Sequence, residues 1–173
     1  NIRNFSIIKP PPVSRKPIIS SAGFFSKTLI KQIILKEVSR GGQVYFVDNS
    51  VDNLRGFYSY LSRALSGISF GFVYGSLPAN SLLQTMEDFI NKKTQVLLST
   101  TIIESGIDIG STNSIIINNA HLFGLSQLYQ LRGRVGRSGI QAFAWFLVPK
   151  KFSLAPDGVK RLKAIVKHSA LGV

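Results

Sequence analysis

Three arginines stand close together among glycines in the last third of the chain. Arg132, Arg134 and Arg137 lie within the sequence QLYQLRGRVGR. Guanidinium groups at this spacing repel one another, so a bound anion gives a physical reason for keeping them together. The guanidinium group is planar and always charged, and it forms paired hydrogen bonds with phosphate oxygens. Gly133 and Gly136 let the backbone turn between them. The spacing predicts a phosphate site, and the alternative is a solvated basic loop.

The apolar pattern predicts the elements that position these arginines. Three- and four-residue apolar steps predict a helix from Ser26 that is stopped by Gly41-Gly42. Further helices are expected at 51–65, 82–90, 125–132 and 158–167. Apolar runs predict strands at 43–47, 68–73, 95–99, 114–118 and 142–148. Apolar strands that alternate with amphipathic helices are typical of an α/β fold with a mostly parallel sheet covered on both faces.

Parallel sheets bind ligands at the loops beyond the carboxyl ends of their strands. Polar side chains follow several of the expected strands there. The loops concerned are 48–50, 74–76, 100–101 and 119–121. We therefore expect further contacts to a ligand along this edge of the sheet.

The chain is expected to contain one folded domain between two less regular ends. Prolines punctuate residues 1–16, which predicts an extended lead-in or linker. Residues 17–150 are expected to form the domain, and 151–173 a linker and the start of a following helical segment. Because the chain begins with Asn1 and shows no leader-like segment, we expect it to be part of something longer.

Charge and composition narrow the class of partner. The chain has 21 Lys and Arg against 8 Asp and Glu, a formal net charge of +13. This excess favours a polyanion, either nucleic acid or an anionic membrane surface. With no cysteine and two histidines, we expect no metal site of this chain's own. No apolar run reaches the roughly 18 to 20 residues that span a bilayer, so no membrane-spanning segment is expected. The cationic residues are scattered and no helix is strongly basic on one face, so a membrane-surface role is not expected either.

The sequence also lacks the parts that usually hold a nucleoside triphosphate. No Gly-x-x-x-x-Gly-Lys-Ser/Thr occurs, and no Gly-Lys pair occurs at all. The amide cradle and lysine of a P-loop are therefore missing. No acidic magnesium-binding motif follows a strand. We expect this chain alone to hydrolyse no ATP.

Several segments together resemble the motor domains of superfamily 2 helicases. Gln130 followed by GRVGR is similar to motif six, in which Gln or His precedes Gly-Arg-x-Gly-Arg. TTIIESGIDI from Thr100 resembles motif five, and GGQVYF from Gly41 resembles motif four. The stretch INNAHLFGLSQLYQLRGRVGRS, and RLKAI from Arg161, resemble the bacterial transcription-repair coupling factors. The resemblance covers nearly the whole chain and implies a RecA-like three-layer αβα domain, the second lobe of a two-lobed motor.

The resemblance also implies roles at a nucleotide. Arg134 and Arg137 would be arginine fingers that reach the terminal phosphates of ATP, which binds with Mg mainly on a preceding lobe of the same chain. Gln130 would sense the nucleotide. Gly106 and Asp108 would approach it from motif five, with Asp108 near the ribose or linked to the arginines.

The same resemblance implies contacts to DNA. Thr100 and Thr101 would offer hydroxyl and amide groups to a phosphate of double-stranded DNA, and Ser76 would join them from the neighbouring loop. Lys150 and Lys151 would be peripheral helpers.

Plainer interpretations remain open for some of these residues. Asp108 could pair with an arginine for structural reasons only, Thr100 could cap a helix, and His121 fits a satisfied loop histidine better than a base. Two positions depart from the family pattern. Gly110 replaces a usual proline, and Tyr74 replaces a usual histidine, which puts the details of DNA geometry in doubt.

The function implied by the resemblance is ATP-dependent movement on double-stranded DNA. The whole protein would couple stalled RNA polymerase to excision-repair proteins, in a bacterial-type cytoplasm associated with the nucleoid. One alternative is the corresponding lobe of a branch-migrating recombination helicase. Another is a non-catalytic RecA-like module that only binds nucleic acid.

Overall fold

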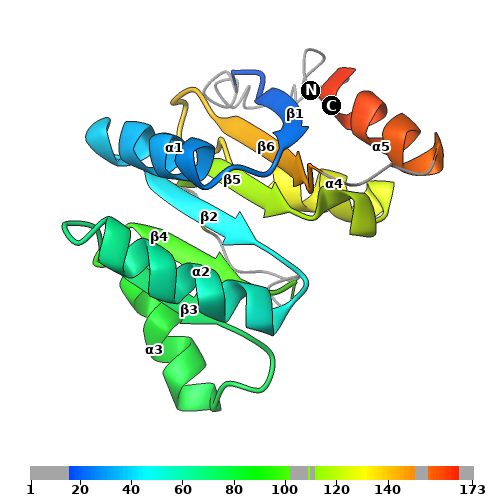
Figure 1. The fold of residues 1–173 in the computed structure, drawn as a ribbon. Coiled ribbons are helices and arrows are strands. Elements are labelled where there is room, and N and C mark those ends of the chain that lie inside the picture. The colour runs from blue at the N-terminus through cyan, green and yellow to red at the C-terminus, as the bar shows by residue number, and fades with distance from the viewer. Residues whose placement is uncertain (1–15, 102–108, 110–111, 151–155, 168–173) are drawn as a thin grey trace, which may run out of the picture.

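The computed structural model describes residues 16–101, 109, 112–150 and 156–167. Within them, strands alternate with helices along nearly the whole chain (Figure 1). The strands are β1 (Ile19–Phe24), β2 (Gln43–Val47), β3 (Phe70–Val73), β4 (Val96–Ser99), β5 (Thr112–Asn118) and β6 (Phe143–Val148). The helices are α1 (Lys27–Ser39), α2 (Val51–Ala64), α3 (Ala79–Ile90), the short 3-10 helix η1 (Ala120–Leu122), α4 (Leu125–Arg132) and α5 (Pro156–Lys167).

The six strands of the described residues form one sheet in the order β1-β6-β5-β2-β4-β3. Every adjacent pair is parallel. The prediction of an α/β fold with a mostly parallel sheet is therefore confirmed. Because all strands point the same way, the loops that leave them share one edge of the sheet, and the segments that enter them share the other.

Helices cover both faces of the sheet, which gives the predicted three layers (Figure 1). Side chains alternate between the two faces along β2: Val44 and Phe46 pack with α1 and α2, whereas Tyr45 and Val47 pack with α3, α4 and α5. All four are at most 1% exposed. A strand buried on both faces reads as a continuous apolar run, as these residues did in the sequence.

Serine and glycine residues set the limits of the first two helices. Ser26 caps α1 by accepting a hydrogen bond from Leu29 N at 3.2 Å, and Ser50 does the same for α2 with Asn53 N at 3.2 Å. Beyond the end of α1, Gly41 has φ +82°, which glycine adopts without strain. The predicted end of α1 at Gly41-Gly42 is confirmed.

The strand β1 was missing from the predicted elements. It pairs with β6 at the edge of the sheet, with Ile19 opposite Phe143 and Phe24 opposite Val148. Its sequence, ISSAGF, mixes small and polar residues because only part of an edge strand is buried. Ile19 is 49% exposed and Phe24 is 57% exposed, so no apolar run marked this segment.

The last described helix, α5, shares the core of the sheet. Its Leu162 and Ile165 belong to the apolar cluster on the side of α3 and α4. It also contacts β1, η1 and α4. A helix that buries its apolar stripe in this way contributes to the stability of the domain.

Candidate phosphate-binding site

The three residues expected to contact nucleic acid meet at one edge of the sheet. Thr100 and Thr101 follow β4, and Ser76 follows the neighbouring strand β3. Thr100 N donates a hydrogen bond to Val73 O at 3.3 Å, which ties the two loops together at their roots. Ser76 is exposed and Thr101 is half-buried. Ser76 and Thr101 therefore place two hydroxyl side chains next to solvent at the carboxyl edge.

Thr100 itself is turned inward. It is 7% exposed, and its hydroxyl has no hydrogen-bond partner among the described residues. Its carbonyl accepts a hydrogen bond from the Ser99 hydroxyl at 2.6 Å. The alternative in which Thr100 caps a helix concerns residues 102–108, which lie outside the described part of the chain. A phosphate contact through this hydroxyl would require Thr100 to become uncovered.

A buried carboxylate organises the same edge. Asp48, which is fully buried, accepts hydrogen bonds from Ser50 N and from Asn118 Nδ2, both at 2.8 Å. Asn53 and Asn119 donate to it at 3.4 Å. Asp48 thus joins the loop after β2 to the end of β5. Sequence reasoning named its loop but gave Asp48 no role, although an acidic residue directly after a buried strand was a usable signal.

The structure separates Arg132 from the other two arginines. Arg132 is 5% exposed, and its Nη1 donates to Ile165 O in α5 at 2.9 Å. Its guanidinium lies 4.8 Å from the ring centre of Tyr129. Burial lowers the pKa of Arg132, and Tyr129 opposes that shift. The role of Arg132 is to hold α4 against α5, so the prediction that three neighbouring arginines form one phosphate cluster was wrong for this residue.

Arg134 and Arg137 lie in the turn that follows α4. Arg134 is half-buried, and Arg137 is exposed, as is Gln130 on α4. Gly136 stands between them with φ +82°, and its N–H donates to Thr112 O at 3.3 Å. A Cβ at Gly136 would lie 3.0 Å from Ala142 Cβ. Both the backbone angle and the close approach require glycine here.

The charge of Arg134 acts on the core below the turn. Burial raises the pKa of Tyr45 to about 12, while a hydrogen bond with Ser99 and the charge of Arg134 both lower it. Tyr45 faces α3, α4 and α5. The charge of Arg134 thus acts on the side of the sheet that carries α4.

The predicted residues divide between opposite edges of the sheet. The turn with Arg134 and Arg137 is bonded to Thr112, the first residue of β5, so it lies at the amino edge. Thr100 and Ser76 follow their strands and lie at the carboxyl edge. The expectation that ligand contacts gather beyond the carboxyl ends therefore covers only half of the candidate site. The reason is that α4 carries the chain back across the sheet before the arginines appear.

The remaining residues named in the sequence analysis add little to the candidate site. Gly106, Asp108 and Gly110 lie outside the described residues. His121 is half-buried; burial, and then the charge of Arg161, lower its pKa. Its backbone carbonyl accepts a hydrogen bond from Arg161 Nη2 at 3.0 Å.

The described residues contain no group of three or more His, Cys, Asp or Glu side chains that could hold a metal ion. No helix among them is both long enough and apolar enough to cross a membrane.

The fold and the arginine turn together define a helicase domain. Residues 26–139 match the helicase conserved C-terminal domain, and the chain belongs to this family. It is 44% identical over 171 residues to the transcription-repair-coupling factor of Myxococcus xanthus, and 40% identical over 171 residues to that of Escherichia coli strain K12. Each alignment covers 99% of the chain but only 14% and 15% of those proteins, respectively. The chain is thus similar to a small part of much longer relatives.

Solved structures agree with this assignment. RecG bound to a three-way DNA junction superposes with a TM-score of 0.75 at 30% identity, covering 92% of the chain and 22% of RecG. The C-terminal domain of the DEAD-box protein Dbp5 superposes with a TM-score of 0.63 at 20% identity, covering 88% of the chain and 85% of that domain. The predicted RecA-like fold is confirmed, and the second comparison bears on the fold alone.

Proposed function

We propose that this chain is the second motor lobe of an ATP-dependent translocase on double-stranded DNA. The observation that carries the proposal is the turn after α4, where Arg134 and Arg137 flank a glycine that is fixed to the start of β5. Arg137 is exposed, so it can meet a phosphate brought by another lobe. Charge that develops on a transferred phosphoryl group is stabilised by guanidinium groups placed in advance.

The residues present suit only part of an ATP site. The arginine turn suits the terminal phosphates, but the sequence has no P-loop, and the described residues hold no acidic cluster for Mg. ATP with Mg supplies the phosphoryl group and would be held mainly by a preceding lobe. This chain would contribute Arg134, Arg137 and Gln130 to it, with Gly106 and Asp108 from motif five. Hydrolysis would then take place only where the two lobes meet.

The carboxyl edge of the sheet, opposite the arginine turn, would bind the DNA backbone. Ser76 and Thr101 would bond to phosphate oxygens, and Thr100 would do so after a small opening that uncovers its hydroxyl. The net charge of +13 supports binding to a polyanion without a choice of sequence. Binding of duplex DNA should weaken steeply as salt rises, and salt-independent binding would contradict this part of the proposal.

The partners proposed for the whole protein rest on its relatives, which are named transcription-repair-coupling factors. We propose that the full protein acts on stalled RNA polymerase and brings excision-repair proteins to it, in a bacterial-type cytoplasm and near the nucleoid.

The deciding experiment measures DNA-stimulated ATP hydrolysis by three proteins. They are this chain, this chain joined behind a first lobe that carries a P-loop, and the joined protein with Arg137→Ala. We expect hydrolysis only from the second, with kcat reduced by about 10³ in the third. If the third is as active as the second, the arginine assignment fails. If the first hydrolyses ATP, the proposal that the reaction needs both lobes fails.

One observation favours a second candidate. RecG at 30% identity was solved on a three-way DNA junction, so a branch-migrating role fits the same fold. The joined protein can distinguish the two functions. Removal of a stalled RNA polymerase from linear duplex would support coupling to transcription, and conversion of a three-way junction without such removal would support the second candidate.

A further inference from the structure

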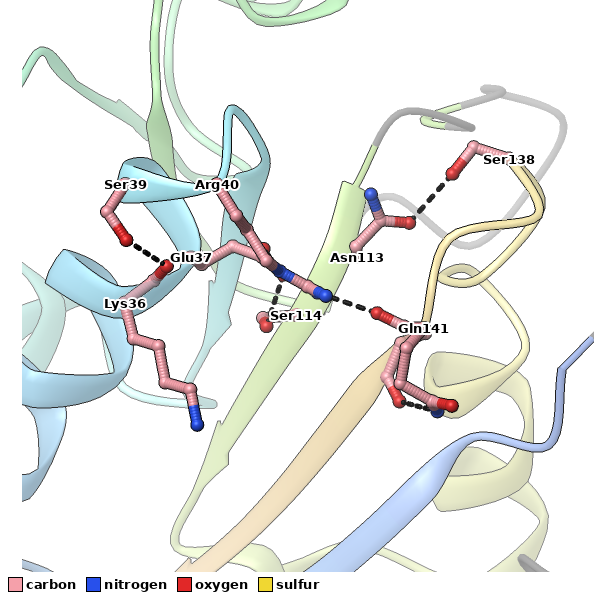
Figure 2. A network of polar contacts seen from close by, with 9 residues as sticks. Lys36, Glu37, Ser39, Arg40, Asn113, Ser114, Ser138 and Gln141 are labelled. Atoms are coloured by element: carbon pink, nitrogen blue, oxygen red, sulfur yellow. Dashed lines mark hydrogen bonds and ion pairs between the residues drawn. The ribbon is translucent and has the colours of Figure 1, made fainter.

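The turn that carries the proposed arginine fingers is held at several points along the amino edge of the sheet (Figure 2). Gly136 N donates to Thr112 O at 3.3 Å, and two residues later the Ser138 hydroxyl donates to Asn113 Oδ1 at 2.9 Å. Both partners belong to β5. These bonds fix the turn to the sheet but not to any helix.

A third anchor comes from the end of α1. Arg40 Nη2 donates to Gln141 O at 2.6 Å, although the two residues are 101 positions apart in the sequence. Gln141 Nε2 in turn donates to Pro17 O at 2.7 Å. Arg40 therefore joins α1 to the segment between the proposed fingers and β6.

Arg40 is itself held by a buried carboxylate. Glu37, one turn earlier on α1, is 2% exposed and pairs with Arg40 Nε and Nη2. The Ser114 hydroxyl of β5 donates to Glu37 Oε1, the same oxygen that accepts from Arg40 Nη2 (Figure 2). The paired bonds to the carboxylate leave the guanidinium little freedom, and they hold Nη2 where it also donates to Gln141 O.

Gly42 makes room for this arrangement. A Cβ at position 42 would lie 2.5 Å from Glu37 Oε2 and 2.8 Å from Glu37 Cδ. Any other residue would push the carboxylate away from Arg40. Motif four, which begins at Gly41, thus supports the Glu37–Arg40 pair as well as starting β2.

We propose that Glu37 and Arg40 are positioning residues for the arginine turn. They do not touch the nucleotide; they set where Arg134 and Arg137 lie by fixing the far end of their turn. This inference rests on the proposed function. A displacement of about 1 Å in a reacting or charge-stabilising group can cost up to about a hundredfold in rate.

The test uses the joined two-lobe protein and ATP as the probe. In Glu37→Gln, the neutral amide no longer holds Arg40, and no unpaired charge is left buried. We expect kcat to fall about tenfold, with KM for ATP changed less than about threefold, because the fingers act on the transition state. The kcat of Arg40→Met should fall at least as far, and the kcat of Arg40→Lys should fall less than that of Arg40→Met.

A double-variant comparison separates positioning from simple destabilisation. Once Arg137→Ala has removed a finger, Glu37→Gln should cost much less than it costs alone, because it acts through that finger. Arg63→Met is the matched control. Within the described part of the chain Arg63 bonds only to Ser59 of α2, so this change should leave kcat unchanged.

Each outcome has a distinct meaning. If Glu37→Gln costs the same with and without Arg137, its role is structural and this inference is overturned. If Arg137→Ala lowers kcat but Glu37→Gln and Arg40→Met do not, only this inference is overturned. If Arg137→Ala has no effect, the finger assignment fails first, and the positioning role fails with it.

Discussion

Replacing Arg132 with methionine tests whether this arginine holds two helices together or binds phosphate. The guanidinium of Arg132 donates to Ile165 O, a backbone carbonyl of α5. A hydrogen bond from a charged group contributes roughly 1.5 to 3 kcal/mol, and a guanidinium near an aromatic ring about 0.5 to 2 kcal/mol. Methionine keeps the apolar stem, so we expect Arg132→Met to lower the unfolding free energy by about 2 to 4 kcal/mol.

That loss should be visible in thermal unfolding followed by circular dichroism. For a chain of this size, each 1 kcal/mol shifts Tm by about 2 to 4 °C, so a fall of roughly 5 to 15 °C is expected. Arg137→Met is the matched control, because Arg137 is exposed and should change Tm little. If Arg132→Met leaves Tm within about 1 °C of the wild type, the bond to Ile165 does not stabilise the fold. Arg132 would then again be a candidate phosphate ligand.

Three further changes test the core around the site. Gly42→Ala would place its Cβ 2.5 Å from Glu37 Oε2. We therefore expect the unfolding free energy, measured by chemical denaturation, to fall by about 1 to 3 kcal/mol. An unchanged unfolding free energy would mean that the carboxylate moves freely. Asp48→Asn turns an amide toward Asn118 Nδ2 and should cost about 2 kcal/mol, with a neutral result contradicting the buried network. Burial raises the pKa of Tyr45 from 10.0 to about 12. The protonated Tyr45 hydroxyl therefore contributes fully to the unfolding free energy below pH 10, and this contribution is lost as pH rises toward 12. In Tyr45→Phe, the unfolding free energy should fall less over this pH range.

Local patterns predicted most of the sheet and its helices. The expected strand at 43–47 and helix at 125–132 coincide with β2 and α4, because each combines a clear apolar pattern with a neighbouring glycine. The other expected elements differ from the observed ones by a few residues at their ends. Burial on both faces makes such strands easy to find, since nearly every side chain in them must be apolar.

The features that the sequence did not predict depend on contacts between distant segments. β1 is recognisable only once β6 is present to pair with it, since half of its side chains face solvent. Arg132 looked equivalent to Arg134 and Arg137 because spacing along the chain does not reveal which guanidinium points into the core. Its partner, Ile165, is 33 residues away. The pairing of Arg40 with Gln141 is hidden for the same reason.

The division of the candidate site between two edges has a consequence for how such a lobe would work. Thr100 ends at the carboxyl edge beside the proposed DNA contacts, and Thr112 begins β5 at the amino edge beside the arginine turn. The residues between these two positions in the sequence include most of the stretch that resembles motif five. Because Gly136 is bonded to Thr112, a shift at the start of β5 reaches the arginines through one hydrogen bond. In the proposed function, the DNA contacts and the fingers would be linked along the chain through this stretch, whereas Glu37 and Arg40 approach the turn from the face of the sheet that carries α1.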